Sequence, residues 1–237
     1  MVFWELFHTT TTNYNTDDFF ITSKTDPNGI YSMWFKEIFE STIGSRSDEL
    51  KTYLKEHDLS LIFECIDIEN DPHIIEYDYS HIVLLDAVKN QIKFEKIPFE
   101  ELVEIGNRFN IKVKQKAYTI NTWQDFCLWL EDVVSETFLF SGKPIEGFVV
   151  EDANGYMFKV KSHYYLMWKK LRSVAGETIK FGCIHGSGQL YTPTMNYFYS
   201  WVKDHWLEFK NGNYRTDIIS LRNMFYFDNE TKKRCIK

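Results

Sequence analysis

A charged β-hairpin within residues 145–162 is the feature that most constrains the fold of this chain. Two strand-like runs flank the turn sequence Asp152-Ala153-Asn154-Gly155, and an Asn-Gly pair is a strong short-range hairpin signal. With a loop of two or four residues, even positions of the first strand share a face with odd positions of the second. That face then carries Glu146, Phe148, Lys159 and Lys161. A three-residue loop with a bulge would change this pairing.

Strands and helices alternate along the rest of the chain. Short apolar runs predict strands at 59–66 and 82–88, and helical spacing of apolar residues predicts helices at 34–42, 47–57, 99–109, 122–134, 164–173 and 193–209. The aromatic run 2–8 is expected to pair with residues 18–22 across a polar Thr/Asn loop. This order predicts an α+β protein, with antiparallel sheets and flanking helices in residues 1–175 and a small, mainly helical C-terminal extension in residues 176–237.

Composition excludes several classes of protein. The 237 residues include 44% hydrophobic residues and have a net charge of −7, which indicates a folded domain and argues against a polyanion-binding surface over the whole molecule. A local basic groove stays possible, and basic residues do cluster after the hairpin. No apolar run approaches the roughly 18–20 residues of a membrane span, and no signal peptide is recognisable. The four cysteines form no C-x-x-C pair, so we expect a cytoplasmic protein without a disulfide framework or a zinc site.

The charged face of the hairpin has two possible explanations. Charges on a strand are most often simply solvated, and spacing alone favours that interpretation. The alternative is a nucleotide phosphate site, in which Lys159 and Lys161 neutralise phosphate oxygens while Glu146 holds a divalent metal. Glu64, at the end of the apolar run 61–63, is a second candidate carboxylate.

Several segments together resemble the covalent nucleotidyltransferase superfamily, specifically ATP-dependent RNA ligases of the phage RNA ligase 1 type. The strings Ile62-Phe63-Glu64 and 70–86 resemble the third-motif region of that family. Glu146-Gly147-Phe148-Val149-Val150 resembles the fourth motif. Phe158-Lys159-Val160-Lys161-Ser162, with Tyr165 four residues past Lys161, resembles the fifth. The resemblance covers roughly residues 3–168 and implies a nucleotidyltransferase (ATP-grasp-like ligase) core.

The resemblance also implies roles for individual residues. Glu64 would contact the nucleotide ribose or support the site, and Glu146 would help to bind Mg²⁺. Lys159 and Lys161 would hold the α-phosphate, while Phe148 and Tyr165 would contribute to nucleotide binding. Such enzymes transfer AMP from ATP to an active-site lysine, then to an RNA 5′-phosphate, and finally join that end to a 3′-hydroxyl. The implied cofactors are therefore ATP and Mg²⁺, the implied partners are RNA ends, and the implied setting is RNA repair in the cytoplasm, or in a host cytoplasm if the protein is phage-encoded.

The chain departs from the family pattern at the nucleophile. No Lys-x-Asp-Gly string occurs in it, and Lys24-Thr25-Asp26-Pro27-Asn28-Gly29 is expected to be a turn. We therefore expect a ligase core without its N-terminal portion, which needs an upstream polypeptide that supplies the lysine. A non-catalytic nucleic-acid-binding fragment, or a decayed ligase, is the main alternative, and a DNA ligase or capping-type enzyme of the same superfamily is a third interpretation.

Overall fold

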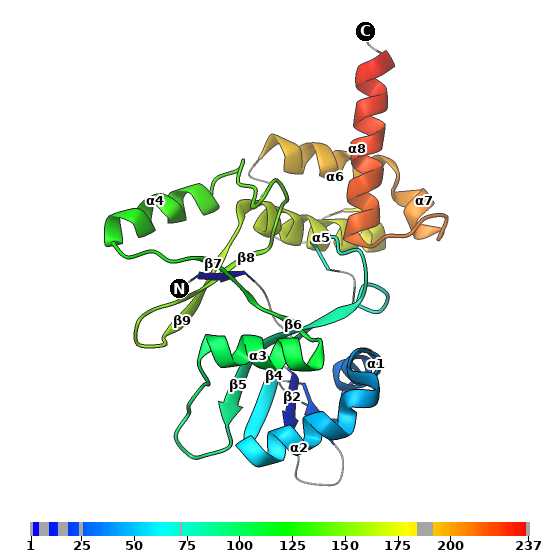
Figure 1. Ribbon diagram of the computed structural model, residues 1–237. Coiled ribbons are helices and arrows are strands. Elements are labelled where there is room, and N and C mark those ends of the chain that lie inside the picture. The colour runs from blue at the N-terminus through cyan, green and yellow to red at the C-terminus, as the bar shows by residue number, and fades with distance from the viewer. Residues whose placement is uncertain are drawn as a thin grey trace. The chain divides into compact units, whose positions relative to one another are not determined.

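The computed structural model describes residues 2–4, 10–13, 19–23, 26–71, 73–183 and 192–235 (Figure 1). The chain divides into two compact units. We call one the sheet unit; it comprises Met1–Asp71, Tyr77–Thr122 and Phe148–Lys159. The other, which we call the helical unit, comprises Pro72–Glu76, Trp123–Gly147 and Val160–Lys237. The boundary expected between residues 175 and 176 stays a prediction.

Two sheets are present among the described residues. The larger has the strand order β3-β2-β4-β5-β6 and consists of β2 (Thr10–Asn13), β3 (Phe20–Thr22), β4 (Leu59–Ile66), β5 (His81–Lys89) and β6 (Lys112–Val113). The smaller has the order β7-β1-β8-β9 and consists of β1 (Val2–Trp4), β7 (Gln115–Tyr118), β8 (Gly147–Glu151) and β9 (Met157–Lys161). The pairings with a described register are antiparallel except for β5 with β6.

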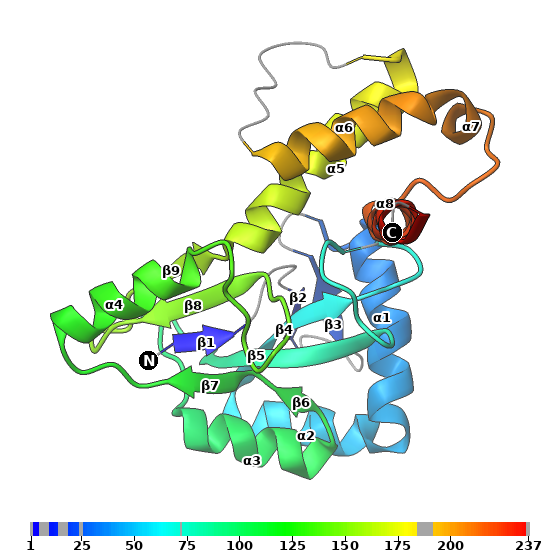
Figure 2. The same ribbon diagram turned by 90° about the horizontal axis from the view of Figure 1, so that it is seen from above.

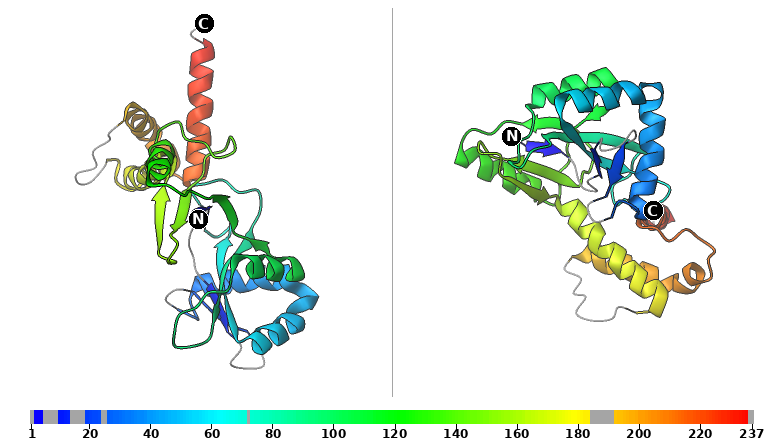
Figure 3. Two further views of the ribbon diagram at one scale, coloured as in Figure 1. Left: turned by 60° about the vertical axis from the view of Figure 1, so that its left-hand side comes forward. Right: turned by 90° about the horizontal axis from the view of Figure 1, so that it is seen from below.

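Three helices cover one face of the five-stranded sheet (Figures 2 and 3). They are α1 (Ile30–Ile43), α2 (Ser47–His57) and α3 (Phe99–Phe109). Leu61 and Phe63 of β4 are fully buried among their apolar side chains. Because side chains alternate along a strand, Glu64 belongs to the opposite face of β4.

The helical unit has an aromatic core of its own. Its helices are α4 (Trp123–Val133), α5 (His163–Phe181), α6 (Pro193–Asp204), α7 (Trp206–Lys210) and α8 (Ile218–Cys235). Trp168 of α5 is completely buried and meets Phe198 of α6 edge to face, with 5.3 Å between ring centroids. The loop after β4 joins this core, because Ile74 is buried in it and Arg222 of α8 donates a hydrogen bond of 2.8 Å to the Ile74 carbonyl.

The structure confirms the α+β class and most of the expected elements. The strand 59–66 and the helices 47–57 and 99–109 have the predicted bounds. The expected pairing of residues 2–8 with 18–22 is wrong, because β3 pairs with β2 and β1 pairs with β7 and β8. The Thr-rich run forms strand β2 instead of a loop, consistent with the β propensity of threonine. The helix expected at 193–209 is interrupted at His205, whose φ of −104° and ψ of 7° separate α6 from α7.

Candidate functional site

The hairpin forms, but its strand parity differs from the expected one. Strand β8 ends at Glu151 and β9 begins at Met157, and the Asp152 N–H donates to the Tyr156 carbonyl across the turn at 2.9 Å. Five residues separate the strands, so odd positions of β8 share a face with odd positions of β9. The prediction that Phe148 shares a face with Lys159 and Lys161 is therefore wrong.

Glu146 and Lys161 nevertheless come together in the helical unit. The Lys161 ammonium donates a hydrogen bond to Oε1 of Glu146, and the same ammonium lies over the ring of Tyr165, 4.8 Å from its centroid. The Glu146 and Lys161 side chains are largely buried, with 13% and 22% of their surfaces exposed. We call Glu146, Lys161 and Tyr165 the hairpin cluster.

Glycine at position 147 allows this meeting. Gly147 has a φ of +149°, which L side chains rarely adopt, so the regular alternation of the strand does not extend back to Glu146. An added Cβ would lie 2.0 Å from the Val160 carbonyl oxygen and 2.8 Å from Cα of Lys161. A side chain at this position would therefore displace the backbone that carries Lys161.

The hairpin cluster lies beside the first turn of α5. Ser162 is the N-cap, and its side-chain oxygen accepts a hydrogen bond from the Tyr165 N–H at 3.1 Å. The Ser162 hydroxyl also donates to the Ile145 carbonyl, and the Ser162 N–H donates to the Glu146 carbonyl at 2.9 Å. These bonds fix Ser162, the residue after Lys161, against residues 145 and 146. A helix N-terminus also adds a partial positive charge that favours an anion.

The remaining predicted residues belong to the sheet unit. Glu64 is 2% exposed on β4 and pairs with Val83 of β5. Phe148 is 1% exposed, and its ring centroid lies 5.7 Å from that of Tyr118. Lys159 is exposed on β9. Their roles in nucleotide binding stay predictions.

A second group of charges shares the sheet face of Glu64. Asp86 pairs with Ile62 in the β4–β5 ladder, so its side chain belongs to the same face as Glu64. One Asp86 oxygen, Oδ2, lies 3.1 Å from Nζ of Lys114 and 3.7 Å from Nζ of Lys96. Lys96 also lies 2.7 Å from Oε1 of Glu151 on β8. We call these four residues the charge network.

Burial is the common property of the charge network. The four side chains expose between 9% and 16% of their surfaces. Burial lowers the pKa of Lys114, while the Asp86 carboxylate opposes that shift. Sequence reasoning missed the network because its members come from separate segments and form no motif. The charged Asp86 inside the apolar run 82–88 was the one available signal.

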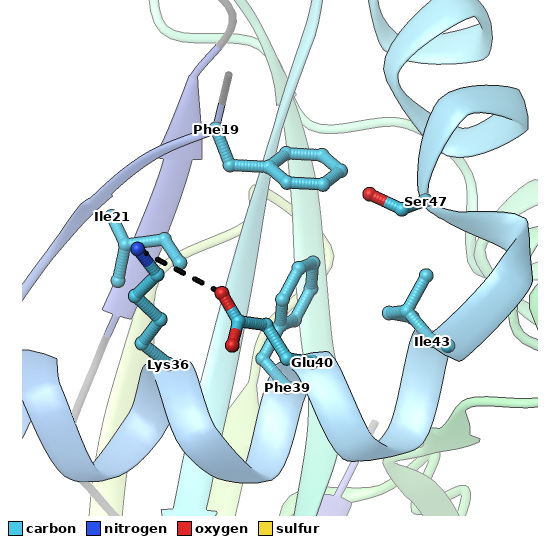
Figure 4. Close-up of a pocket in the computed structure, with 8 residues that line it drawn as sticks. Phe19, Ile21, Lys36, Phe39, Glu40, Ile43 and Ser47 are labelled. Carbon is cyan, nitrogen blue, oxygen red and sulfur yellow. Dashed lines mark ion pairs between the residues drawn. The ribbon is translucent and has the colours of Figure 1, made fainter.

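A separate hollow of about 230 Å³ lies beside α1 (Figure 4). Phe39 and Ile43 form part of its apolar wall, and the exposed ion pair of Lys36 with Glu40 lies at its edge, with 3.7 Å between the charged atoms. None of the predicted site residues lines this hollow. Its polar lining consists of the Lys36–Glu40 ion pair and Ser47.

The Gly-rich segment 182–188 of the sequence lies outside the described residues from position 184 onward, and this part includes His185. Cys65, Cys127 and Cys183 form no disulfide with one another. Within the described residues, no helix is long and apolar enough to cross a membrane, and no three His, Cys, Asp or Glu side chains cluster as metal ligands.

These features define an α+β protein with a lysine–carboxylate cluster at the base of a β-hairpin. The model of a family described as RNA ligase, of the phage RNA ligase 1 type, matches residues 8–165. This match covers more than half of the chain, and the protein belongs to the RNA ligase family.

Individual relatives support the same assignment. A tRNA ligase of Candida albicans is 25% identical over 145 residues, which cover 55% of this chain and 17% of that protein. An archaeal ATP-dependent RNA ligase superimposes with a TM-score of 0.53 at 13% identity, covering 88% of this chain and 51% of the other. A protein of Aquifex aeolicus provisionally assigned as an ATP-dependent DNA ligase superimposes with a TM-score of 0.52 at 14% sequence identity. This match covers 89% of this chain and 53% of the other. The structural matches confirm the ligase fold, and the chain spans about half the length of these solved proteins.

The single carboxylate of the hairpin cluster could supply one ligand to a magnesium ion. Mg²⁺ is usually held by one or two carboxylates together with water and substrate phosphates. Glu146 offers one carboxylate beside the Lys161 ammonium. Such a donor set suits a metal that arrives with nucleotide phosphates and keeps most of its water.

Proposed function

We propose that this chain is part of an ATP-dependent RNA ligase that joins RNA 5′-phosphate and 3′-hydroxyl ends through an adenylated intermediate. The observation that carries the proposal is the contact of Lys161 with Glu146 under the Tyr165 ring, at the start of α5. An ammonium, a carboxylate and a helix N-terminus together suit a phosphate group accompanied by a divalent metal.

Each residue of the hairpin cluster has a distinct task in this proposal. Lys161 neutralises the α-phosphate of the nucleotide as its oxygens gain charge in the transition state. Glu146 holds the metal, which offsets phosphate charge and helps to position the leaving group. Tyr165 holds the Lys161 ammonium by a cation–π contact and limits its rotamers. The family resemblance implies that Lys159, Glu64 and Phe148 also take part in nucleotide binding.

The chain contains no Lys-x-Asp-Gly motif, so the lysine that forms the adenylate must come from another source. A lysine nucleophile must lose its proton before it attacks phosphorus, whereas Lys159 and Lys161 must stay protonated to hold phosphate. We infer that a polypeptide carrying a Lys-x-Asp-Gly motif, acting in the cytoplasm, supplies the nucleophile. The alternative is a non-catalytic RNA-binding fragment, or a decayed ligase, that depends on such a partner.

Joining of a pre-adenylated RNA tests the proposal, because this step needs no new lysine adduct. The chain is mixed with an RNA that carries AMP on its 5′-phosphate, an acceptor RNA with a 3′-hydroxyl, and Mg²⁺. We expect a joined product and released AMP. Lys161→Met should slow joining by about 100-fold or more, as expected for the loss of a group that stabilises transition-state charge.

The control variant is Lys170→Met, which removes a cation of α5 outside the hairpin cluster and should join RNA at the wild-type rate. Binding of the RNA without any joining would support the non-catalytic alternative. Joining at equal rates by the wild type and Lys161→Met would contradict the assigned role of the hairpin cluster.

A further inference from the structure

An aromatic hollow in the helical unit lies apart from the hairpin cluster. It has a volume of about 480 Å³ and is bordered by α6, α7, α8 and the segment before α8. This volume falls within the roughly 300–1,000 Å³ of typical small-molecule sites. The residues that give the hollow its chemistry are Trp201, His205, Phe209, Tyr214, Phe227 and Asp228.

The walls of the hollow suit a flat ring. Trp201 and Phe209 are 6% and 4% exposed, and their ring centroids lie 5.4 Å apart. Tyr214 and Phe227 are 51% and 71% exposed. Two buried rings thus form a fixed wall, while two exposed rings offer faces on which an incoming base can stack. Stacking of unpaired bases on aromatic side chains is the usual way in which proteins bind single-stranded RNA.

The polar groups of the hollow select among the bases. Oδ2 of Asp228 accepts a hydrogen bond from Nε1 of Trp201 at 2.8 Å, which fixes the carboxylate against the aromatic wall. Glu208 adds a second carboxylate, and His205 and Asn223 complete the polar lining. Ionised carboxylates only accept hydrogen bonds. Guanine is the RNA base that presents two adjacent donors, its N1–H and its amino group, on the Watson–Crick edge.

The other bases match this lining less well. Adenine and cytosine each place a ring nitrogen acceptor beside their amino group on that edge, and uracil has carbonyl oxygens on both sides of its single N–H. Each of these acceptors would face carboxylate oxygen. The lining therefore favours guanine.

The charge of the surrounding chain favours RNA over a cationic peptide. An arginine side chain would also suit aromatic rings beside a carboxylate. Residues 193–235, which carry the helices around the hollow, contain seven Lys and Arg against five Asp and Glu, a net charge of +2, whereas the whole chain carries −7. A basic segment attracts a phosphate backbone and repels a cationic peptide.

We propose that this hollow binds an unpaired guanine of the RNA substrate. The proposal rests on the RNA-joining function for its choice of ligand, and it assigns a base preference to the C-terminal helices. Asp228 receives the Watson–Crick edge, and Phe227 and Tyr214 stack on the base.

Equilibrium dialysis of the chain with GMP, AMP, CMP and UMP tests the proposal without requiring ligation. We expect GMP to bind the wild type about tenfold or more tightly than CMP or UMP. AMP also occupies the nucleotide site proposed at the hairpin cluster, so GMP and AMP are compared in Lys161→Met, where the same preference for GMP is expected. Asp228→Asn should abolish this preference, because asparagine keeps an oxygen for the Trp201 N–H but turns a donor toward the base. Phe227→Ala should weaken binding of GMP by removing a stacking face.

Two controls separate the hollow from other sites. Lys161→Met removes the phosphate-binding lysine of the hairpin cluster and should leave the GMP preference intact. Tyr197→Ala removes an aromatic ring of α6 that is 69% exposed and outside the hollow, and it should behave like the wild type. Circular dichroism melting confirms that each variant is folded.

Equal affinity for all four nucleotides would overturn the proposal, as would a GMP preference that persists in both Asp228→Asn and Phe227→Ala. A GMP preference that is lost only in Lys161→Met would assign the binding to the hairpin cluster and would also overturn it. Failure to join adenylated RNA, with a GMP preference that depends on Asp228, would refute the ligase function alone.

Discussion

The charge network and the hairpin cluster both pair lysine with carboxylate, yet their surroundings differ. In the charge network, two lysines and two carboxylates compensate one another, and every side chain is at most 16% exposed. In the hairpin cluster, one lysine meets one carboxylate beside an aromatic ring, and Lys161 and Glu146 are 22% and 13% exposed. The two sites are therefore similarly buried and differ in their number of charges. A phosphate that binds Lys161 has to replace a single ion-pair partner, whereas a ligand of the network would have to disrupt several ion pairs at once. We conclude that the network stabilises the sheet unit, and the comparison supports the proposal that the cluster binds phosphate.

Asp86→Ala should give the largest loss of stability. The substitution leaves the Lys114 ammonium buried without its carboxylate, and breaking a buried ion pair in this way typically costs about 3–5 kcal/mol. Urea unfolding measures the change. Lys36→Ala is the control, because the pair of Lys36 with Glu40 is exposed and its loss should cost at most about 0.5 kcal/mol. Equal effects of the two substitutions would contradict a structural role of the network.

Gly147→Ala should damage the hairpin cluster through the backbone. The added Cβ would meet the Val160 carbonyl oxygen, and the positive φ would be strained, so we expect a loss of about 2–3 kcal/mol. The matched control is Gly176→Ala on α5, where an added Cβ meets no atom within 4 Å. That substitution should stabilise the protein by about 0.5–1 kcal/mol. A tolerated Gly147→Ala would show that the cluster does not need this backbone conformation.

The buried thiol of Cys65, next to Glu64 on β4, should make the stability of the protein depend on pH. Burial, with a smaller effect of the Asp67 and Glu64 carboxylates, raises its pKa from 9.0 to about 12. Above pH 9 the unfolded chain releases this proton before the folded chain does, so the stabilisation declines as the pH rises toward 12. By pH 10 the loss amounts to about 1.4 kcal/mol.

Urea unfolding at pH 8 and pH 10 measures this loss. Between pH 8 and pH 10, the free energy of unfolding of Cys65→Ala should fall by about 1.4 kcal/mol less than that of the wild type. Cys183→Ala, which removes an exposed thiol, should behave like the wild type. Equal losses in Cys65→Ala and the wild type would contradict the burial of this thiol.

Local sequence signals predicted the elements that depend on local physics. The strand 59–66 and the helix 99–109 follow from apolar periodicity and have the expected bounds. The pairing of β1 could not be predicted in this way, because β1 pairs with strands more than 100 residues away. The break at His205 was also missed, since the aromatic stripe continues across it in the sequence.

The same distinction holds for the candidate site. The sequence placed Glu146 and Lys161 on one face of the hairpin, and the structure brings the two side chains together. The argument from strand parity reached that meeting by an incorrect route, because it assumed an even number of loop residues and regular alternation at Gly147. The charge network required knowledge of four segments at once, and no local pattern in the sequence contains that information.

Comparing AMP with adenosine tests the central claim most directly, because the two ligands differ only in the phosphate. Calorimetric titration in the presence of Mg²⁺ should show that the wild type binds AMP at least tenfold more tightly than adenosine. Lys161→Met should reduce this ratio toward one. Because the Lys161–Glu146 pair is largely buried, its loss also lowers the free energy of unfolding, and urea unfolding confirms that the variant is folded under the conditions of the titration. An unchanged ratio in Lys161→Met would contradict the claim that the hairpin cluster binds phosphate.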